Sequence, residues 1–225
     1  MILVPFGDLH LGYNCFNLEK AEKVVEFIEQ KEAYWLGMGD YIDNTPPSHR
    51  YYITGRATMT VQEEVFAFVD LIEPIKDRCI GLLYGNHEVR TLREEFDPVL
   101  QIAKMIGKIE LAKGYTYAFD FAGRKIFAAH GNTSSSTKSY RIKKLLDLAN
   151  LSDADVYLMG HVHEIDHFRD AIMTAEGLKE RLFVFTGSFV EYKNSYAEEK
   201  LLKPTPTGCN ALFFGEKMIE VKRIV

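Results

Sequence analysis

The side chains best able to do chemistry in this chain are aspartates, asparagines and histidines that gather in short clusters. The clusters are Asp8-Leu9-His10, Gly39-Asp40, Gly85-Asn86-His87-Glu88, His130 and Gly160-His161-Val162-His163. Asp8 and His10 lie two residues apart, so one loop can direct an oxygen and a nitrogen at the same cation. The two oxygens of Asp40 can bridge two cations. Carboxylate and imidazole ligands without thiolates favour manganese, iron, zinc or magnesium over a structural zinc. The pattern therefore predicts a two-metal hydrolytic site.

Apolar runs directly before the first three clusters predict the β-strands that position them. These strands are expected at residues 1–6, 33–38 and 79–84, with amphipathic helices between them at 18–31 and 61–75, the second ended by Pro74. In open α/β sheets the functional loops lie at the carboxyl ends of the strands. We therefore expect the clusters to meet at one rim of a sheet.

The remainder of the chain is predicted to be mostly β. We expect a helix at about 92–106, which Pro98 either bends or delays, a helix at 139–150, and strands at 115–121, 124–129, 155–159, 166–173, 182–187, 209–214 and 217–224. Because proline cannot donate to a sheet, Pro5 should lie near the end of its strand or at a bulge. The order of elements predicts two sheets packed face to face with helices outside. Residues 44–60 and 191–206 are two polar insertions, and long loops of this kind usually carry function.

The composition narrows the class of protein. With 225 residues and 47% hydrophobic content, we expect a single domain over residues 1–225. The net charge of -5 indicates no overall basic field for nucleic acid or an anionic membrane, although a local basic patch stays open. Cys15, Cys79 and Cys209 are widely spaced and odd in number, which argues against a disulfide framework and a thiolate zinc site. No leader pattern or membrane-spanning run is evident, so we expect a soluble, cytoplasmic protein.

The clusters resemble, in order, the motifs of the calcineurin-like metallophosphoesterase superfamily. Those motifs are D-x-H, G-D-x-x-D or a variant, G-N-H-E/D, H and G-H-x-H, and the resemblance covers residues 8–163. It implies an α/β fold, a four-layer α/β/β/α sandwich of two mixed sheets flanked by helices. It also implies two metal sites, one bound by Asp8, His10, Asp40 and His163, the other by Asp40, Asn86, His130 and His161. The chain departs from the family where Ala129 precedes His130, since the family commonly has glycine there.

The stretch Gly39-Asp40-Tyr41-Ile42-Asp43 resembles the G-D-Y-V-D-R-G stretch of the phosphoprotein phosphatases, whose second aspartate orients the histidine of G-N-H-E. This resemblance implies that Asp43 holds His87. A carboxylate partner raises the pKa of an imidazole, so we expect a cationic His87 that stabilises the transition state or protonates the leaving oxygen. Asn44 replaces the arginine of that stretch, so phosphoprotein specificity is not implied. Glu88 and Arg90 are expected to be supporting charges, with orientation of the substrate as the alternative.

The implied function is hydrolysis of a phosphodiester or phosphomonoester by a hydroxide shared between two divalent metal ions about 3.5 to 4 Å apart. We expect Mn²⁺, with Fe, Zn, Ni or Mg as alternatives. Arg50, Tyr51 and Arg56 in the first insertion are predicted to bind the substrate, because interleaved cationic and aromatic side chains stack bases or clamp phosphate. A packed loop is the alternative for these three residues.

Two other functions stay open. One is a DNA exonuclease or endonuclease like the nuclease subunit of the SbcCD repair complex, against which the acidic net charge argues. The other is a non-catalytic scaffold with the same fold, against which the intact Asp8, Asn86 and His87 argue. Basic residues at 138–144 form either a solvated helix face or a nucleic-acid contact. The aromatic residues at 189–196 either line the cleft or form an interface, and the oligomeric state is not indicated.

Overall fold

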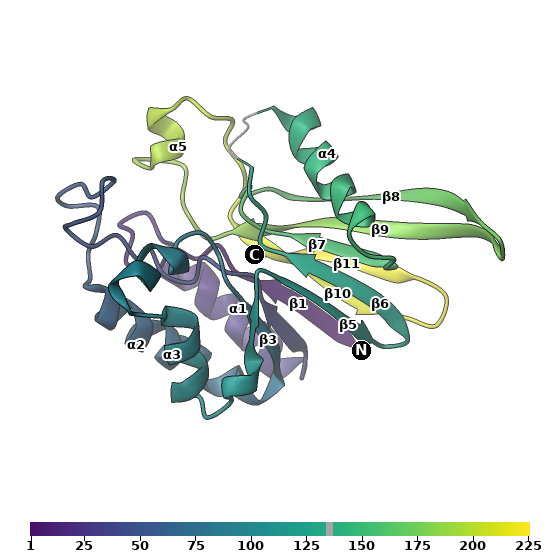
Figure 1. The fold of residues 1–225 in the computed structure, drawn as a ribbon, viewed down its shortest axis with the longest axis horizontal. Helices are drawn as coiled ribbons and strands as arrows, with labels where there is room; N and C mark the ends of the chain where they lie inside the picture. The colour runs from purple at the N-terminus through teal and green to yellow at the C-terminus, as the bar shows by residue number, and fades with distance from the viewer. Residues whose placement is uncertain (134–136) are drawn as a thin grey trace.

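The computed structural model describes residues 1–133 and 137–225 and has a mixed α/β fold (Figure 1). The helices are α1 (Leu18–Gln30), α2 (Val61–Ile72), α3 (Pro98–Met105), α4 (Lys138–Asp147) and α5 (Tyr196–Glu199). The strands are β1 (Ile2–Phe6), β2 (Tyr34–Gly37), β3 (Cys79–Leu83), β4 (Ala112–Gly114), β5 (Thr116–Phe121), β6 (Arg124–Ala129), β7 (Val156–Met159), β8 (Ile165–Thr174), β9 (Gly177–Ser188), β10 (Gly208–Phe214) and β11 (Ile219–Ile224). Among the described helices, none is both long and apolar enough to cross a lipid bilayer.

The strands pair along one path that divides into two halves. The first half has the order β4-β3-β2-β1-β10, with β11 beside β10, and the second has the order β9-β7-β6-β5, with β8 beside β9. Strands β1 to β4 are parallel to one another and β10 is antiparallel to β1, whereas β7 is parallel to both β6 and β9. The halves are joined by the pairs Gly208–Ser188 and Cys209–Gly187. Both halves are therefore mixed sheets, as the resemblance implied.

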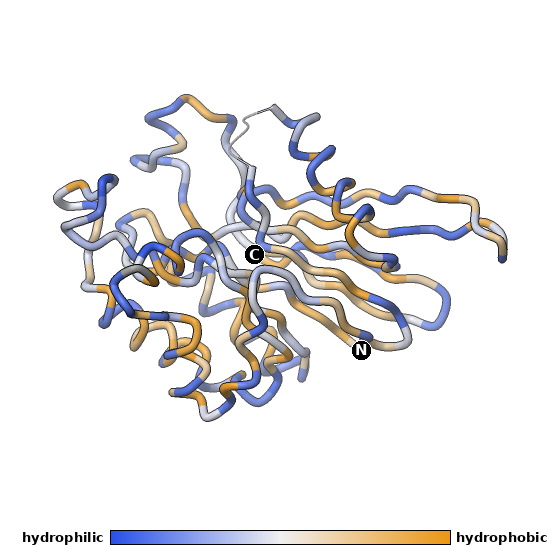
Figure 2. The backbone as a smooth tube through the Cα atoms, viewed as in Figure 1, coloured by the Kyte–Doolittle hydropathy of each residue, from blue (hydrophilic) through white to orange (hydrophobic). Residues whose placement is uncertain are grey.

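Three apolar clusters define the layers of the fold. Between the two halves lies a cluster that includes Leu3, Leu36, Ile126, Leu158 and Val184. The opposite face of the first half packs against α1, α2 and α3, and the opposite face of the second half packs against α4. Figure 2 shows hydrophobic stretches along the strands and hydrophilic residues at the turn between β10 and β11. The result is the expected α/β/β/α arrangement.

Local sequence signals set where the helices begin. Asn17 accepts a hydrogen bond from the backbone N–H of Lys20 at the start of α1, and Thr60 forms a capping box with Glu63 at the start of α2. Because Asp97 caps α3 and Pro98 occupies its first turn, the segment predicted as a helix at 92–106 divides into a 3₁₀ turn, η3 (Leu92–Glu94), and α3. Proline thus delays this helix rather than bending it.

The boundaries predicted for several strands and helices need correction. Helix α2 ends at Ile72 and continues as a 3₁₀ turn, η1 (Glu73–Arg78), and α4 ends at Asp147 before another, η5 (Leu148–Asn150). Strand β9 begins at Gly177 rather than 182, because residues 177–181 pair with β8 in a long hairpin. Pro5 lies one residue before the end of β1, beyond the two residues that pair with β10. Because the pairing with β10 ends before Pro5, the absence of a backbone N–H at this residue is tolerated, as expected.

Candidate metal centre

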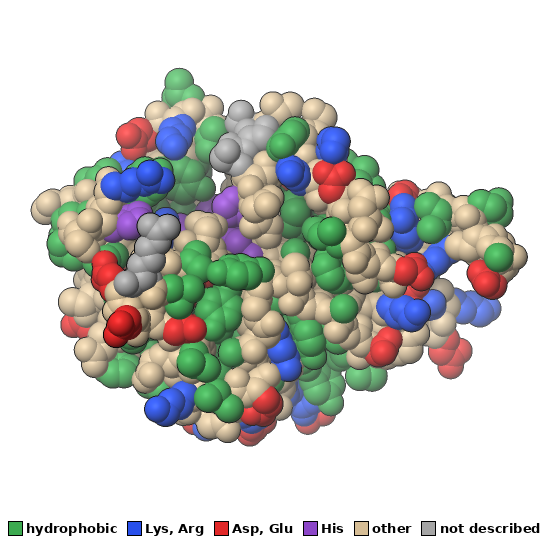
Figure 3. All heavy atoms as spheres, in the orientation of Figure 1, with side chains coloured by type: hydrophobic (Ala, Val, Ile, Leu, Met, Phe, Trp, Pro, Cys, Tyr) green, Lys and Arg blue, Asp and Glu red, His purple; other side chains and the backbone are tan. Residues whose placement is uncertain are grey.

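The loops that follow β1, β2, β3, β6 and β7 carry the five clusters and meet at one rim, as predicted. Backbone hydrogen bonds join the first two loops, from the N–H of Asp8 to the carbonyl of Gly39 at 2.9 Å and from Leu9 to Asp40 at 2.9 Å. Figure 3 shows histidine side chains in a hollow on one face of the molecule. The rule that functional loops lie at the carboxyl ends of strands therefore holds here.

The loops approach so closely that two motif positions tolerate only glycine. A Cβ atom at Gly39 would lie 2.5 Å from the backbone nitrogen of Gly85, and one at Gly85 would lie 2.1 Å from Oδ1 of Asp40. Gly39 also has a φ of +88°. These glycines bring the loops after β2 and β3 into direct contact, and they explain why the Gly-Asp and Gly-Asn pairs occur at these positions.

Five of the seven predicted metal ligands adopt backbone conformations that are unusual for residues other than glycine. Their φ angles lie between +50° and +66°, at Asp8, His10, Asp40, His161 and His163. Each such residue costs about 1 kcal/mol or more and persists only where its surroundings enforce it. Strain of this kind concentrates at functional sites. The left-handed turns direct successive side chains, such as Asp8 and His10, toward the same centre.

The predicted ligands form overlapping groups around Asp40. Candidate ligand atoms lie within 4.8 Å of one another in the groups Asp8–His10–His163, His10–Asp40–His87 and Asp40–His130–His161. Nε2 of His10 lies 3.1 Å from Nε2 of His163 and 3.8 Å from Oδ2 of Asp40. On the other side, Nε2 of His130 lies 3.3 Å from the same Asp40 oxygen. These oxygen and nitrogen donors fit two adjacent divalent cations.

Asn86 and His130 also lie together. Oδ1 of Asn86 is 3.1 Å from Nε2 of His130, and Nδ1 of His130 is 2.8 Å from the carbonyl oxygen of Met38. Because a carbonyl oxygen can only accept, Nδ1 carries the proton and Nε2 is the ring nitrogen that faces the ligand group. The backbone thus fixes the orientation of the imidazole, as outer hydrogen bonds commonly do for metal-binding histidines.

Four of the candidate ligands are buried, namely Asp8, His10, Asp40 and His130, and these include groups of opposite charge. Burial tends to raise the pKa of Asp40, but the imidazoles of His130 and His87 hold it well below its usual value. Burial likewise opposes protonation of His130, yet Asp40 raises the pKa of His130 to about 10. Burial and the neighbouring His87 lower the pKa of His10. The Asp40–His130 pair must therefore lose a proton before a cation binds, so metal affinity should depend on pH.

The environment of His87 differs from the sequence-based expectation. Its Nδ1 lies 2.6 Å from the backbone carbonyl oxygen of Asp43, whereas the Asp43 carboxylate is 3.6 Å away. Arg90 lies 2.7 Å from the other ring nitrogen, Nε2. Burial, aided by Arg90, lowers the pKa of His87 to about 3, so the imidazole is neutral rather than cationic. The prediction failed because burial outweighs the attraction of the neighbouring carboxylates.

Glu88 and Asn44 hold the motif loops together. The buried Glu88 carboxylate accepts hydrogen bonds from the backbone N–H groups of Asp40 and Tyr41, each at 2.8 Å, and of Gly85 at 2.9 Å. Asn44 donates from its side chain to the carbonyl of His87 at 2.6 Å. Glu88 is therefore a structural charge, one of the two roles considered for it. The structural use of Asn44 was not expected, because the sequence showed only that it replaces an arginine.

Comparison with known proteins identifies the family. The sequence matches the calcineurin-like phosphoesterase family over residues 3–165, which is more than half of the chain. The chain belongs to the calcineurin-like phosphoesterase family. A search of curated proteins finds no significant match. Membership agrees with the fold and with the presence of a candidate metal centre at the rim.

Solved structures show the same fold at low sequence identity. A novel archaeal phosphodiesterase is 15% identical, with a TM-score of 0.57 and 99% of each chain covered. Vps29 from Chaetomium thermophilum is 14% identical, with a TM-score of 0.56, covering 100% of this chain and 97% of that one. Vacuolar protein sorting 29 from Cryptosporidium parvum is 12% identical, with a TM-score of 0.50 and coverages of 99% and 95%. At these identities the likeness shows the fold alone.

The two insertions of this phosphoesterase-family chain contact each other beside the centre. Arg56 of the first insertion donates to Glu199 of α5 at 2.7 Å. The second insertion also contacts the loop after β1, where the Tyr13 hydroxyl accepts from the backbone N–H of Tyr196 at 3.0 Å. Arg50 stacks on the exposed Tyr51 ring at 4.6 Å. Of the three predicted substrate-binding residues, Arg56 is therefore already paired with a carboxylate. The other two form an exposed stacked pair.

Tyr196 is the residue of the second insertion that reaches the candidate ligands. Its hydroxyl lies 3.5 Å from Nδ1 of His163, and burial together with the nearby Asp8 raises the pKa of Tyr196 to about 12. The sequence predicts that Tyr196 lies either in the cleft or at an interface, and the structure places it beside His163. Its spacing from the motifs gave no further signal, since only folding of the insertion brings it there.

The remaining sequence candidates lie outside the centre. The basic run at the start of α4 pairs with acids of β8 and the turn before it, with Lys138 at 2.7 Å from Asp166 and Arg141 at 3.6 Å from Glu164. His167 lies in β8, and the ring of His49 makes an edge-to-face contact with that of Tyr51. Ser134, Ser135 and Ser136 lie outside the described residues.

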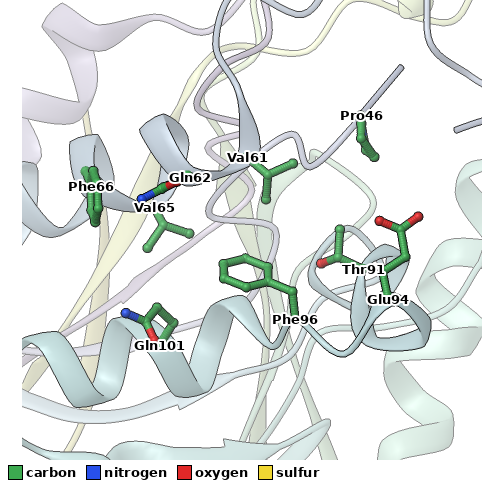
Figure 4. A pocket seen from close by; sticks show the side chains of 9 residues that line it. All are labelled: Pro46, Val61, Gln62, Val65, Phe66, Thr91, Glu94, Phe96 and Gln101. Carbon is green, nitrogen blue, oxygen red and sulfur yellow. The ribbon is translucent and has the colours of Figure 1, made fainter. Parts of the chain in front are cut away.

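A separate cavity of about 470 Å³ lies between α2 and α3 (Figure 4). It is lined by Pro46, Val61, Gln62, Val65, Phe66, Thr91, Glu94, Phe96 and Gln101. None of the candidate metal ligands lines this cavity. It meets the site only indirectly, because Thr91 accepts a hydrogen bond from the Asn44 side chain at 3.1 Å.

Proposed function

We propose that this chain is a metal-dependent phosphoesterase that hydrolyses a phosphodiester or phosphomonoester. The position of Asp40 carries the proposal, because its Oδ2 lies 3.8 Å from Nε2 of His10 and 3.3 Å from Nε2 of His130. One carboxylate thus stands between two groups of ligands. Two-metal hydrolytic sites use a bridging ligand in this way, and membership of the phosphoesterase family supports the assignment.

We further propose that each cation has four protein ligands. The ligands of the first are Asp8, His10, Asp40 and His163, and those of the second are Asp40, Asn86, His130 and His161. The spacing of the three ligand groups supports this division, although His87 also lies within reach of His10 and Asp40. The mixture of oxygen and nitrogen ligands suits Mn²⁺, and metal analysis would separate it from Fe, Zn, Ni and Mg.

The chain's own residues hold these ligands in place before a cation arrives. The backbone N–H of His161 donates to both carboxylate oxygens of Asp8 at 3.0 Å. The N–H of His87 donates to Oδ1 of Asp40 at 2.8 Å and leaves Oδ2 facing the imidazoles. When bound, two divalent cations lower the pKa of a water molecule and offset the charge of the phosphoryl oxygens. Fixed ligands reduce the reorganisation that such binding requires.

His87 and Asp43 are proposed to act together on the reacting group. His87 Nε2 lies 4.0 Å from Asp40 Oδ2, so the imidazole borders the metal centre. Its Nδ1 proton is held by the Asp43 carbonyl, so Nε2 of the neutral ring is an acceptor. Nε2 must therefore first take up a proton from water before it stabilises the transition state or protonates the leaving oxygen. In the present arrangement Nε2 accepts from Arg90. Proton transfer therefore requires that contact to open.

The test is hydrolysis of bis-p-nitrophenyl phosphate and p-nitrophenyl phosphate, in Mn²⁺ and then in chelator. Asp40→Ala should abolish turnover, and Asp120→Ala, which removes an exposed aspartate of β5, serves as the matched control. Diester cleavage that requires metal and Asp40 would establish a phosphodiesterase, and preference for the monoester would establish a phosphatase. Substantial activity in Asp40→Ala would contradict the bridging role.

Two further measurements address the alternatives. Single-stranded and double-stranded DNA, offered to the same proteins, test the nuclease function. A protein that binds metal but cleaves none of these substrates would favour the scaffold, a function for which the Vps29 structures supply a similar fold only.

We also propose one domain over residues 1–225, because β10 and β11 extend the sheet that contains β1. Three buried free cysteines agree with the predicted cytoplasmic setting.

A further inference from the structure

Arg90 is a half-buried cation that forms no salt bridge with a carboxylate of the described residues. It ends the 3₁₀ turn η2 (Glu88–Arg90), three residues after His87. In the part of the chain that the structure describes, no carboxylate oxygen lies within 4.0 Å of its guanidinium nitrogens, and its hydrogen-bond partners are all neutral. Acidic groups, with Asp43 and Asp40 first among them, attract Arg90 only from beyond that distance. Removing a cation from water without a direct counter-charge is costly. Such a group gains most from an anion that arrives with a ligand.

The two terminal nitrogens of Arg90 are held differently. Nη1 donates to the Asp43 carbonyl at 2.9 Å and to the Thr45 hydroxyl at 2.6 Å, so it has two oxygen acceptors. Nη2 has one partner, Nε2 of His87 at 2.7 Å. One side of the guanidinium is thus anchored to the segment from Asp43 to Thr45. The other side is directed at the candidate catalytic imidazole and can exchange one acceptor for another.

Asn44 helps to hold the turn that carries Arg90. The side chain of Asn44 is fully buried and donates to the His87 carbonyl at 2.6 Å and to the Thr91 hydroxyl at 3.1 Å. These contacts join the turn that carries Arg90 to the loop after β2. Asn44 therefore positions a cation that it does not itself provide.

We infer that Arg90 is the phosphate-binding residue of this site, donating from Nη2 to a non-bridging phosphoryl oxygen and thereby releasing Nε2 of His87. The inference rests on the proposed function for the identity of the anion. A phosphoryl oxygen is a stronger acceptor for a guanidinium than a neutral imidazole. Substrate binding therefore removes the contact that keeps His87 from the leaving oxygen, and it couples arrival of the anion to availability of the imidazole.

The first experiment measures inorganic phosphate binding to the metal-loaded protein by calorimetry. Arg90→Gln should keep both metals and bind phosphate about ten- to a hundred-fold more weakly, the usual worth of a charged hydrogen bond. Arg90→Lys, which keeps the charge but loses the second nitrogen, should lie between it and the wild type. Arg223→Gln, which removes an exposed arginine of β11, is the matched control. Phosphate affinity unchanged in Arg90→Gln would overturn the inference.

A second measurement uses the wild-type protein and decides the question if Arg90→Gln fails to fold. In the ¹⁵N-labelled, Zn²⁺-loaded protein, inorganic phosphate should shift the side-chain signal of Arg90 and the Nε2 signal of His87, while the signal of Arg223 stays in place. Signals of Arg90 and His87 that do not respond would overturn the inference. Failure of the proposed function would look different, since the wild type would then bind metal and phosphate but release no p-nitrophenol from either ester.

Discussion

The motif loops and the two insertions lie side by side but are held by different forces. The motif loops are joined by backbone hydrogen bonds, by the close approach of Gly39 and Gly85, and by the buried carboxylate of Glu88. The insertions are joined near the centre by side-chain contacts such as Arg56–Glu199. Backbone hydrogen bonds and buried contacts thus hold the motif loops, whereas the Arg56–Glu199 contact between the insertions is partly exposed. We expect changes in the first region to alter chemistry and changes in the second to alter substrate binding.

The largest effect is expected from Asn86→Ala. Loss of the Asn86 oxygen removes one proposed ligand of the second cation while leaving the other group intact. Metal analysis should give about one bound ion in place of two, with turnover reduced to background. Asn150→Ala, at an exposed position after α4, provides the comparison. Two tightly bound ions in Asn86→Ala would exclude Asn86 from the ligands.

A smaller but still large effect is expected from His87→Asn. Both metals should stay bound while kcat falls by about two to four decades, the usual reach of acid–base catalysis. Asp43→Asn is the matched variant, because Nδ1 of His87 is held by the backbone carbonyl of Asp43, which the substitution preserves. We expect Asp43→Asn to lower kcat by less than about ten-fold. Equal losses in the two variants would show that the Asp43 carboxylate orients His87 after all.

Glu64 of α2 contacts the start of the first insertion and should make stability depend on pH. It accepts from the backbone N–H of Asn44 at 2.8 Å, and burial raises the pKa of Glu64 from 4.5 to about 8. Because the folded state favours the protonated carboxyl, this group lowers stability as pH rises from about 5 to about 8, by up to about 4 kcal/mol. At pH values below 4.5, the ordinary pKa of glutamate, Glu64 is protonated in both the folded and the unfolded state, so its titration does not change stability.

Urea unfolding at pH 5 and pH 8 tests this linkage. Glu64→Gln should lose less stability over that range than the wild type, since glutamine keeps an acceptor for Asn44 and does not titrate. Glu110→Gln, at an exposed glutamate, should behave like the wild type. If Glu64→Gln and the wild type lose stability equally, the carboxyl does not titrate in this window.

The sequence was sufficient to predict the layers and the ligand loops, because both depend on local patterns. Apolar runs before Asp8, Asp40 and Asn86 predicted strands, and residues at the ends of neighbouring strands necessarily meet. The charge state of His87 was not predictable, since it depends on burial and on Arg90, whose side chain arrives through the fold. The position of Tyr196 was likewise hidden, because the insertion that carries it has no periodic pattern.

The smallest effect is expected in the insertions, at the Arg56–Glu199 pair. The pair is partly exposed, so either substitution should lower stability by less than about 1 kcal/mol. The kinetic constants separate two roles for Arg56. If Arg56 binds the substrate, as the sequence predicts, Arg56→Gln should raise KM several-fold, whereas Glu199→Gln should leave KM unchanged or lower it, because it frees the guanidinium.

If the pair only joins the two insertions, both variants should change KM to the same extent, and the double variant should add nothing further. In either case kcat should stay close to that of the wild type, because neither side chain contacts a candidate metal ligand through a hydrogen bond or ion pair in the described residues. A large fall in kcat in Arg56→Gln would erase the distinction between the motif loops and the insertions, and it would place Arg56 with the residues that act on the reacting phosphoryl group.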